Sequence, residues 1–420
     1  MVWAMTLQVL EKGVGYIVLA VLTRTMLKAE LGAMFFAISI SDLTALALNF
    51  GTDTYLIRRV ASDPEHGLTH LSNVLSIRVV NTAGGYIILN LAIWLIQPEL
   101  SPIMLLVSAY DFLEEIYFSF AAFFSARRQI IYRLLIFGGF KLMGFPVIVL
   151  VAYVTRALLP VLWTYLTFNL LLVVTVFIFT RRVFGRIRFA WRPRAILETL
   201  RSAFPFFLVN GLGLMHMRLD TIMVGAMLDF QQLANYGLGI RLLEVSRFIF
   251  RPLMTVFLPI FVEYSINRRW QKFRQRFNQF MIAAFAIGTL LAIVMQVFGL
   301  EVIRSLFGPN YVESVAPAQI LFISLPFLYL YLIANVAANA LHMERKTVIV
   351  LLVAVVTNLG LNWFAIPAFG ITGAAWVTVI SQTILAIGML ALVLPKLRHP
   401  PRVSSSSESI PEQVTIEDAA

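Results

Sequence analysis

Cysteine is absent from this chain of 420 residues, and charged residues make up only 13% of it. The lack of cysteine excludes disulfides and thiolate metal sites. The five histidines are scattered, without a spacing such as HExxH that would place two ligands on one helix face. We therefore expect no catalytic residues, no metal site and no cofactor.

Hydrophobic residues, in contrast, make up 60% of the chain, and the mean hydropathy is +0.84. An apolar stretch of about 20 residues matches the roughly 30 Å hydrocarbon core of a bilayer. Such stretches predict an all-α polytopic membrane protein with twelve transmembrane helices. We place them at 3–22, 32–56, 72–96, 102–125, 132–153, 157–180, 202–226, 234–262, 277–298, 316–341, 347–366 and 371–394.

Basic residues fall on alternate connections between these helices. The even-numbered connections and the C-terminal flank carry most of the Lys and Arg, whereas the odd-numbered ones carry Arg24, Lys28, Arg156 and Arg304. Cytoplasmic loops retain Lys and Arg, which predicts a multi-pass plasma (inner) membrane protein with both termini cytoplasmic. The net charge of +11 then reflects this rule and attraction to anionic membrane lipids, and we expect no nucleic-acid partner.

The longest polar interruption before the tail divides the helices into two sets of six. A GxG string recurs at Gly13–Gly15 and Gly211–Gly213, where small residues favour close helix packing. Two six-helix lobes around a central cavity are typical of secondary transporters. We expect an N-terminal lobe at 1–180, a cytoplasmic basic linker at 181–201, a C-terminal lobe at 202–394 and a disordered cytoplasmic tail at 395–420.

Several strings in order resemble one family. They are LNFGTDTYLIRRVA (48–61), FPFFLVNGLGLMHMRLD (204–220), NYGLGIRLLE (235–244), FGPNYVES (307–314) and NLGLNWFAIPAFGITGAAWVTVISQ (358–382). Together they resemble the oligosaccharide flippases of polysaccharide biosynthesis, in the multidrug/oligosaccharidyl-lipid/polysaccharide (MOP) exporter superfamily. The first hairpin, at 22–37, departs from the family's usual run, so no role is carried over from it.

The resemblance implies a flippase for cell-surface polysaccharide biosynthesis. It would move a polyprenyl-diphosphate-linked oligosaccharide from the inner to the outer leaflet by alternating access. A glycan cannot cross hydrocarbon unaided, because each unpaired polar group costs several kcal/mol there. Other polysaccharide-export proteins are then candidate partners.

Charges inside the expected helices are the candidate binding groups, because such charges are costly and usually functional. In the eighth helix, Arg241, Glu244, Arg247 and Arg251 are spaced three, three and four residues apart. This spacing places them within about 120° of arc on one helix face. Arginine binds phosphate through two parallel hydrogen bonds, so the face is a candidate diphosphate site.

Two interpretations stay open for Arg218 and Arg241. They either contribute to the diphosphate site or form ion pairs, Arg241 with Asp220 and Arg218 with Glu244, that stabilise the hairpin of the seventh and eighth helices. Arg247 and Arg251 lack an evident partner in that hairpin, which favours a binding role.

Lys12 is either a further contact to the diphosphate or half of a structural ion pair.

Acidic residues gather in the fourth helix, where Asp111, Glu114 and Glu115 share one face. They either form a proton or sodium site that couples ion entry to export, or neutralise Arg78 and Lys141 on neighbouring helices. Asp220 and Glu244 are open to the same two roles, coupling or ion pairing. A coupling H⁺ or Na⁺ is therefore a candidate partner.

Three alternative functions remain. A multidrug or cation antiporter of the same superfamily needs an acidic cavity, against which the arginines of the eighth helix argue. A membrane glycan polymerase or ligase commonly carries a large outer loop, whereas the longest expected here runs only from Glu301 to Ser314. The third is a purely structural partner in a glycan-export complex.

Overall fold

The computed structural model describes residues 2–187 and 211–398, with side chains for all of these except 2–12, 130, 133 and 248–256. All regular structure in these ranges is helical. The first lobe contains α1 (Val2–Thr25), α2 (Lys28–Asn49), α3 (Thr52–Ser62), α4 (Gly67–Ile96), the 3₁₀ turn η1 (Pro98–Leu100), α5 (Ser101–Ala126), α6 (Ile130–Thr155) and α7 (Leu158–Val183).

The second lobe begins, within the described ranges, with a helix over residues 211–227. It continues through α9 (Phe230–Ile266), α10 (Trp270–Phe307), the 3₁₀ turn η2 (Pro309–Ser314), α11 (Val315–Ile323), α12 (Leu325–Ala340) and α13 (Glu344–Arg398). The predicted all-α fold, with twelve spans in two six-helix lobes, is confirmed. Residues 188–201 of the predicted linker and residues 202–210, the start of the seventh predicted span, lie outside the described residues, as does the tail from residue 399.

Two of the predicted spans contain a break, and a third break lies between the last two predicted spans. The span predicted at 32–56 is divided into α2 and α3 at Phe50 and Gly51, which both have left-handed backbone, with φ of 52° and 77°. The span predicted at 316–341 is bent by 41° between its two helical parts. In α13, Gly370 (φ 60°, ψ −143°) separates two arms, and Lys396 returns to donate to the carbonyl of Leu341 at 3.0 Å. These arms are the eleventh and twelfth spans.

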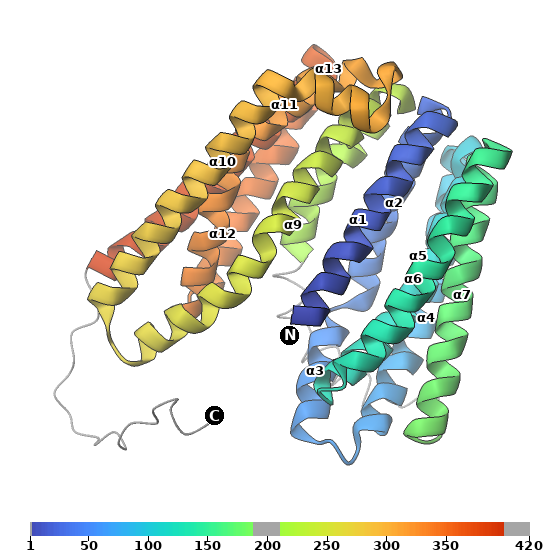
Figure 1. The fold of residues 1–420 in the computed structure, drawn as a ribbon, viewed down its shortest axis with the longest axis horizontal. Coiled ribbons are helices and arrows are strands. Elements are labelled where there is room, and N and C mark those ends of the chain that lie inside the picture. Colours follow the sequence, from blue (N-terminus) through green and yellow to red (C-terminus); the bar gives the residue numbers. More distant parts are fainter. Residues whose placement is uncertain (1, 188–210, 399–420) are drawn as a thin grey trace.

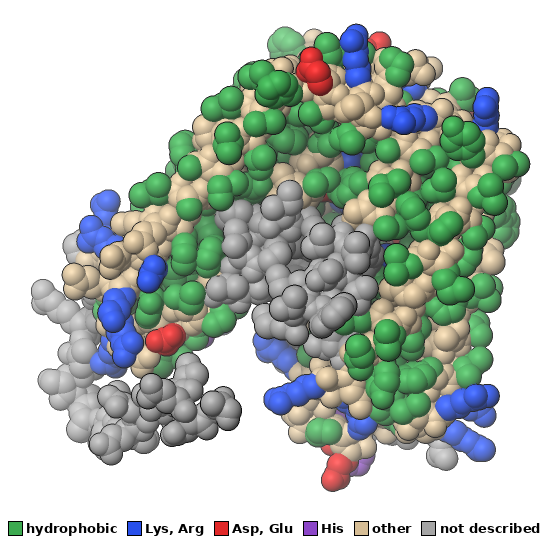
Figure 2. Space-filling model, in the orientation of Figure 1, with side chains coloured by type: hydrophobic (Ala, Val, Ile, Leu, Met, Phe, Trp, Pro, Cys, Tyr) green, Lys and Arg blue, Asp and Glu red, His purple; other side chains and the backbone are tan. Residues whose placement is uncertain are grey.

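Length and apolar composition support a membrane setting. Six of the described helices are long and apolar enough to cross a bilayer, or seven when the bent pair of α11 and α12 is one span. Large apolar side chains such as Ile88, Trp94 and Leu95 lie exposed on the outside of the bundle. Figure 2 shows hydrophobic side chains over the flanks of both lobes, with Lys and Arg gathered mostly at the ends of the bundle.

The two lobes meet at one end of the molecule and diverge toward the other (Figure 1). The turns after α3, α5, α7, α9 and α12, which carry the basic segments, lie at the diverging end. At the joined end α2 packs on α9 through glycines. A Cβ added to Gly32 would overlap the Phe230 carbonyl group, and one added to Gly237 would overlap the Phe35 ring. The lobes are therefore in backbone contact there.

Polar contacts close the same end. Lys28, at the start of α2, lies 3.3 Å from Glu313 of η2, and the Asn235 amide donates to Glu313 at 2.7 Å. The hydrogen bond from Asn235 and the Lys28 ammonium lower the pKa of Glu313, so the carboxylate stays ionised at neutral pH. We call Lys28, Asn235 and Glu313 the latch.

Candidate substrate cavity

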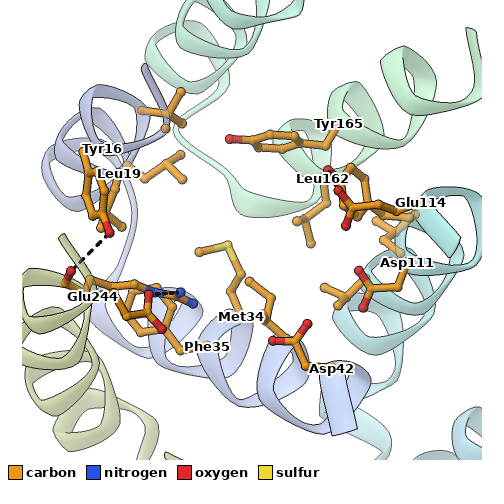
Figure 3. Close-up of a pocket in the computed structure, with 18 of the residues that line it drawn as sticks. Tyr16, Leu19, Met34, Phe35, Asp42, Asp111, Glu114, Leu162, Tyr165 and Glu244 are labelled. Atoms are coloured by element: carbon orange, nitrogen blue, oxygen red, sulfur yellow. Dashed lines mark hydrogen bonds and ion pairs between the residues drawn. The ribbon is translucent and has the colours of Figure 1, made fainter. Parts of the chain in front are cut away.

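A cavity of about 390 Å³ lies between the lobes. Its first-lobe wall is acidic, with Asp42 from α2 and Asp111 and Glu114 from α5, and Lys141 of α6 also lines it. Figure 3 shows these three carboxylates on one side of the pocket, with Tyr16 and Glu244 on the other. One oxygen of Asp111, Oδ2, is buried and accepts no hydrogen bond from the described residues.

An ionic cluster forms the second-lobe wall and joins the lobes. Arg218, from the helix over 211–227, lies 2.8 Å from Asp42 of the first lobe and 3.0 Å from Glu244 of α9. Glu244 also binds Arg241 at 2.8 Å. The hydroxyl of Tyr16 in α1 donates to the Arg241 carbonyl at 3.2 Å. Arg218 therefore bridges two carboxylates from different lobes.

These contacts show which of the two ion pairs predicted for the hairpin of the seventh and eighth helices is present. The predicted pair of Arg218 and Glu244 is present, whereas the predicted pair of Arg241 and Asp220 is wrong. Arg241 reaches Glu244 instead, because residues three apart on a helix are neighbours. The partner that sequence reasoning missed is Asp42, which lies in the other lobe and far from the hairpin along the chain.

A second cavity, of about 500 Å³, lies on the far side of this cluster. It shares Tyr16, Arg218, Arg241 and Glu244 with the first cavity, so these four side chains stand between the two. Of the four arginines that the sequence places in helices seven and eight, Arg218, Arg241 and Arg247 line this second cavity. The first-lobe wall of the first cavity is thus acidic, whereas the second cavity is lined by three arginines and one acid, Glu244.

Arg247 faces this second cavity within electrostatic reach of Glu244 and His216. It has an interaction partner in the structure, so the expectation that it is unpaired is wrong. Its position on the cavity wall is nevertheless the one that a binding role requires. The side chains of Lys12 and Arg251 lie outside the described residues.

A separate buried cluster of polar side chains stabilises the break between α2 and α3. Arg78 of α4 is 1% exposed and binds Asp53 at 2.8 Å and the Glu115 carboxylate at 3.5 Å. It also donates to the hydroxyl of Thr52 and the side-chain oxygen of Asn49. Glu115 therefore neutralises Arg78, as one of the two interpretations predicted, while Asp111 and Glu114 line the first cavity. The acids of α5 thus divide between a structural cluster and the cavity.

Asp220 is buried in the second lobe among neutral donors. Thr378 donates to its carboxylate at 2.6 Å, Asn362 at 2.7 Å and Tyr236 at 3.3 Å. Asn362 donates in addition to Asn358 at 3.2 Å. Among the side chains that the structure describes, Asp220 has no cationic partner. Sequence reasoning missed these donors, although Asn358 and Asn362 stand in the quoted Asn-x3-Asn string and are polar residues inside an apolar helix.

Residues 1–265 match the protein family described as "Polysaccharide biosynthesis protein". The chain belongs to this family. The structure is similar along 94% of the chain to a lipid II flippase, MurJ, in an inward closed conformation, with a TM-score of 0.76, 15% identity and 88% of that chain covered. It is also similar to an inward-facing multidrug resistance MATE transporter of the MOP superfamily, with a TM-score of 0.67, 12% identity and 94% of each chain covered. At 12–15% identity, these structures show that the chain has the fold of the MurJ flippase and of a MOP-superfamily transporter.

A curated relative matches over a shorter stretch. "Probable multidrug resistance protein YoeA" of Bacillus subtilis (strain 168) is 32% identical over 124 residues. These residues span 28% of this chain and 27% of that protein. The two solved structures are those of a flippase and a transporter, and this chain is a multi-span membrane protein of the polysaccharide biosynthesis family.

Proposed function

We propose that this protein is a flippase for a polyprenyl-diphosphate-linked oligosaccharide. The observation that carries the proposal is that Arg218, Arg241 and Arg247 converge on one cavity, formed almost entirely by the second lobe, in a chain of the polysaccharide biosynthesis family. Guanidinium groups match the geometry of phosphate oxygens. A diphosphate entering this cavity would compete with Glu244 for Arg218 and Arg241 and would bind Arg247 on the open side.

The basic end of the bundle supports transport from the inner to the outer leaflet. If the positive-inside rule holds, the diverging ends of the lobes face the cytoplasm, together with both termini. The cavities then open toward the inner leaflet, where the lipid-linked glycan is made available, while the latch closes the outer side. Release of the glycan to the outer leaflet requires the latch to open. At the same time, the cytoplasmic ends of the two lobes (1–180 and 202–394) must approach each other.

Replacing Arg247 by Ala is expected to lower flipping by about 10- to 100-fold, because a charge-assisted hydrogen bond contributes about 1.5–3 kcal/mol. Arg251→Ala should behave alike if its side chain extends the same face. Lys at either position should restore transport in part, since it keeps the charge and loses the planar fork. The measurement is the rate at which a fluorescent polyprenyl-diphosphate-linked glycan becomes accessible to an impermeant quencher in proteoliposomes.

Arg274→Ala is the matched control, because Arg274 is exposed on α10 near the basic end of the bundle and lines neither cavity. It should flip at the wild-type rate. Melting temperature checks that the cavity variants remain folded. Full activity of both Arg247→Ala and Arg251→Ala would exclude the arginine face of α9 as the diphosphate site.

Asp220 is the candidate coupling group for this transport. A buried carboxylate with neutral partners is stabilised either by a proton or by a bound cation, because an isolated buried charge is costly. A void of about 20 Å³ lies against Asp220, His216 and Gln382, about enough for one water molecule. His216 and Gln382 line both this void and the second cavity.

Asp220→Asn is therefore expected to abolish the acceleration of flipping by an ion gradient, while leaving the fold intact, because the amide keeps the size of the carboxyl. Flipping is measured in vesicles under an imposed proton gradient and, separately, an imposed sodium gradient. Wild type should respond to one of the two, which identifies the ion. Glu301→Gln, an exposed acid near the end of α10, is the control. A gradient response retained in Asp220→Asn would rule Asp220 out.

Export of organic cations is a second candidate function, favoured by the acidic wall of the first cavity. Asp42, Asp111 and Glu114 face a common space there, and the multidrug names of two similar proteins accord with it. Vesicles loaded with a cationic dye distinguish the two functions. Dye transport that needs Asp111, without glycan flipping, would favour the cation exporter.

A further inference from the structure

Two polar side chains of the second cavity have buried nitrogen or oxygen atoms without a hydrogen-bond partner among the described residues. His216, from the helix over 211–227, is 6% exposed, and neither of its ring nitrogens is hydrogen-bonded to a described residue. Gln382, from the second arm of α13, is 1% exposed, and its Oε1 accepts no hydrogen bond from the described residues. Both line the cavity of about 500 Å³. Buried polar groups without partners are rare and call for an explanation.

The groups around them restrict what can supply the missing partners. Arg247, Arg218 and Arg241 line the same cavity, with Glu244 as the acid among its lining residues. This excess of positive charge repels a cation. An anion would bind to the guanidinium groups instead, because their hydrogen-bond donors are stronger than those of a neutral amide or imidazole. His216 and Gln382 instead offer both donors and acceptors without charge, which complements neutral hydroxyl and amide groups.

The remaining lining is suited to a small organic group. Tyr331 and Leu328 of α12 and Leu385 of α13 line the cavity beside His216 and Gln382. A few placed polar groups on an apolar and aromatic wall are typical of ligand pockets, and about 500 Å³ falls within their usual range of about 300–1,000 Å³. Arg247 lines both this cavity and the small void that His216 and Gln382 share, so a neutral group bound there would be next to a phosphate held by Arg247.

We propose that His216 and Gln382 form a subsite for the hydroxyl or acetamido groups of the sugar attached directly to the diphosphate. This subsite rests on the proposed flippase function and adds to it a means of telling a glycosylated lipid from a bare prenyl diphosphate. Discrimination of this kind is strong where buried polar groups of a site are left unpaired by the wrong ligand. The subsite therefore selects carriers that already bear a sugar.

The test compares two soluble probes, farnesyl diphosphate and farnesyl diphosphate linked to N-acetylglucosamine. Their affinities are measured on the purified full-length protein in detergent, by the shift in melting temperature and by calorimetric titration. Wild type should bind the glycosylated probe more tightly. Gln382→Met and His216→Phe should each weaken binding of that probe by about fivefold to tenfold, the effect of one hydrogen bond. Neither should change the affinity for farnesyl diphosphate.

Binding of the bare diphosphate is the internal proof that each variant is folded. Arg247→Ala should weaken both probes alike, and His342→Phe and Gln275→Leu, exposed positions at the basic end, should change neither. Equal affinities of wild type for the two probes, or unchanged binding of the glycosylated probe by both subsite variants, would refute the subsite and leave the flippase proposal standing. Failure of wild type to bind either probe would refute the diphosphate proposal, and the subsite with it. If Gln382→Met or His216→Phe does not bind farnesyl diphosphate, it is replaced by Gln382→Asn or His216→Asn, which keeps a shorter polar group. The expected result is the same: weaker binding of the glycosylated probe and unchanged binding of farnesyl diphosphate.

Discussion

Gly32→Leu is expected to abolish transport by preventing the two lobes from closing at the latch end. A side chain at this position of α2 would overlap the carbonyl group of Phe230, the first residue of α9. Backbone at a packed helix end cannot yield as a flexible side chain does, so the helices must separate. In the proposed alternating-access cycle the two lobes exchange between two packed arrangements, so loss of one arrangement removes the cycle. We expect the residual flipping rate to be on the order of 1% of wild type or less, which corresponds to a bias of about 3 kcal/mol against closure.

The absence of cysteine allows this closure to be measured directly. In a Lys28→Cys, Glu313→Cys background, the two positions that form the ion pair of the latch are close enough to be joined by a short bismaleimide. Cross-linking should be efficient with Gly32 and strongly reduced with Gly32→Leu. Gly360→Leu is the control, because a Cβ at Gly360 meets no heavy atom within 4 Å. Efficient cross-linking and normal flipping in Gly32→Leu would show that α2 and α9 do not need this contact.

Arg218→Ala is expected to cost about 3 kcal/mol of stability, near the lower end of the range for breaking a buried ion pair. The lower end applies because the Asp42 side chain, its partner in the first lobe, is 30% exposed. Without Arg218, Asp42 loses the cation that offsets its charge, beside Asp111 and Glu114 in the same cavity wall. Glu244 keeps Arg241, so the loss falls mainly on the contact between the lobes.

The measurement is thermal unfolding followed by tryptophan fluorescence, in which Arg218→Ala should melt several degrees below wild type. Adding Asp42→Asn should recover much of the loss, because it removes the uncompensated charge. Arg269→Ala is the control, since its pair with Glu263 is exposed at 3.6 Å and such pairs contribute about 0–1 kcal/mol. A melting temperature of Arg218→Ala equal to that of Arg269→Ala would mean that the ionic cluster does not hold the lobes together.

The ion pairs show where reasoning from one hairpin succeeds and where it fails. The level of residues along two adjacent helices predicts the Arg218–Glu244 pair, because that level depends on the rise per residue alone. The Arg241–Asp220 pair fails because two side chains at one level can point to different neighbours. Asp220 points toward Asn362 and Thr378 of α13, and Arg241 turns to Glu244.

The acids of α5 were separated by their tertiary neighbours. Glu115 faces Arg78 and Asn49, while Asp111, one turn earlier, lines the cavity. Their helical spacing indicates a common face, yet that face is wide enough to be shared between a structural cluster and an open space. The sequence alone offered the two interpretations and could not assign one residue to each.

The sequence by itself determined the class of this protein, the number of its helices and their division into two lobes, because bilayer thickness sets the length of each apolar stretch. The clustering of basic residues at one end of the bundle follows from their alternation along the chain. Only the tertiary structure decided that Asp42 of one lobe joins Arg218 and Glu244 of the other, and that His216 and Gln382 line one cavity with Arg247. The physical reason is that the azimuth of a helix, and the neighbours it meets, depend on packing among segments hundreds of residues apart.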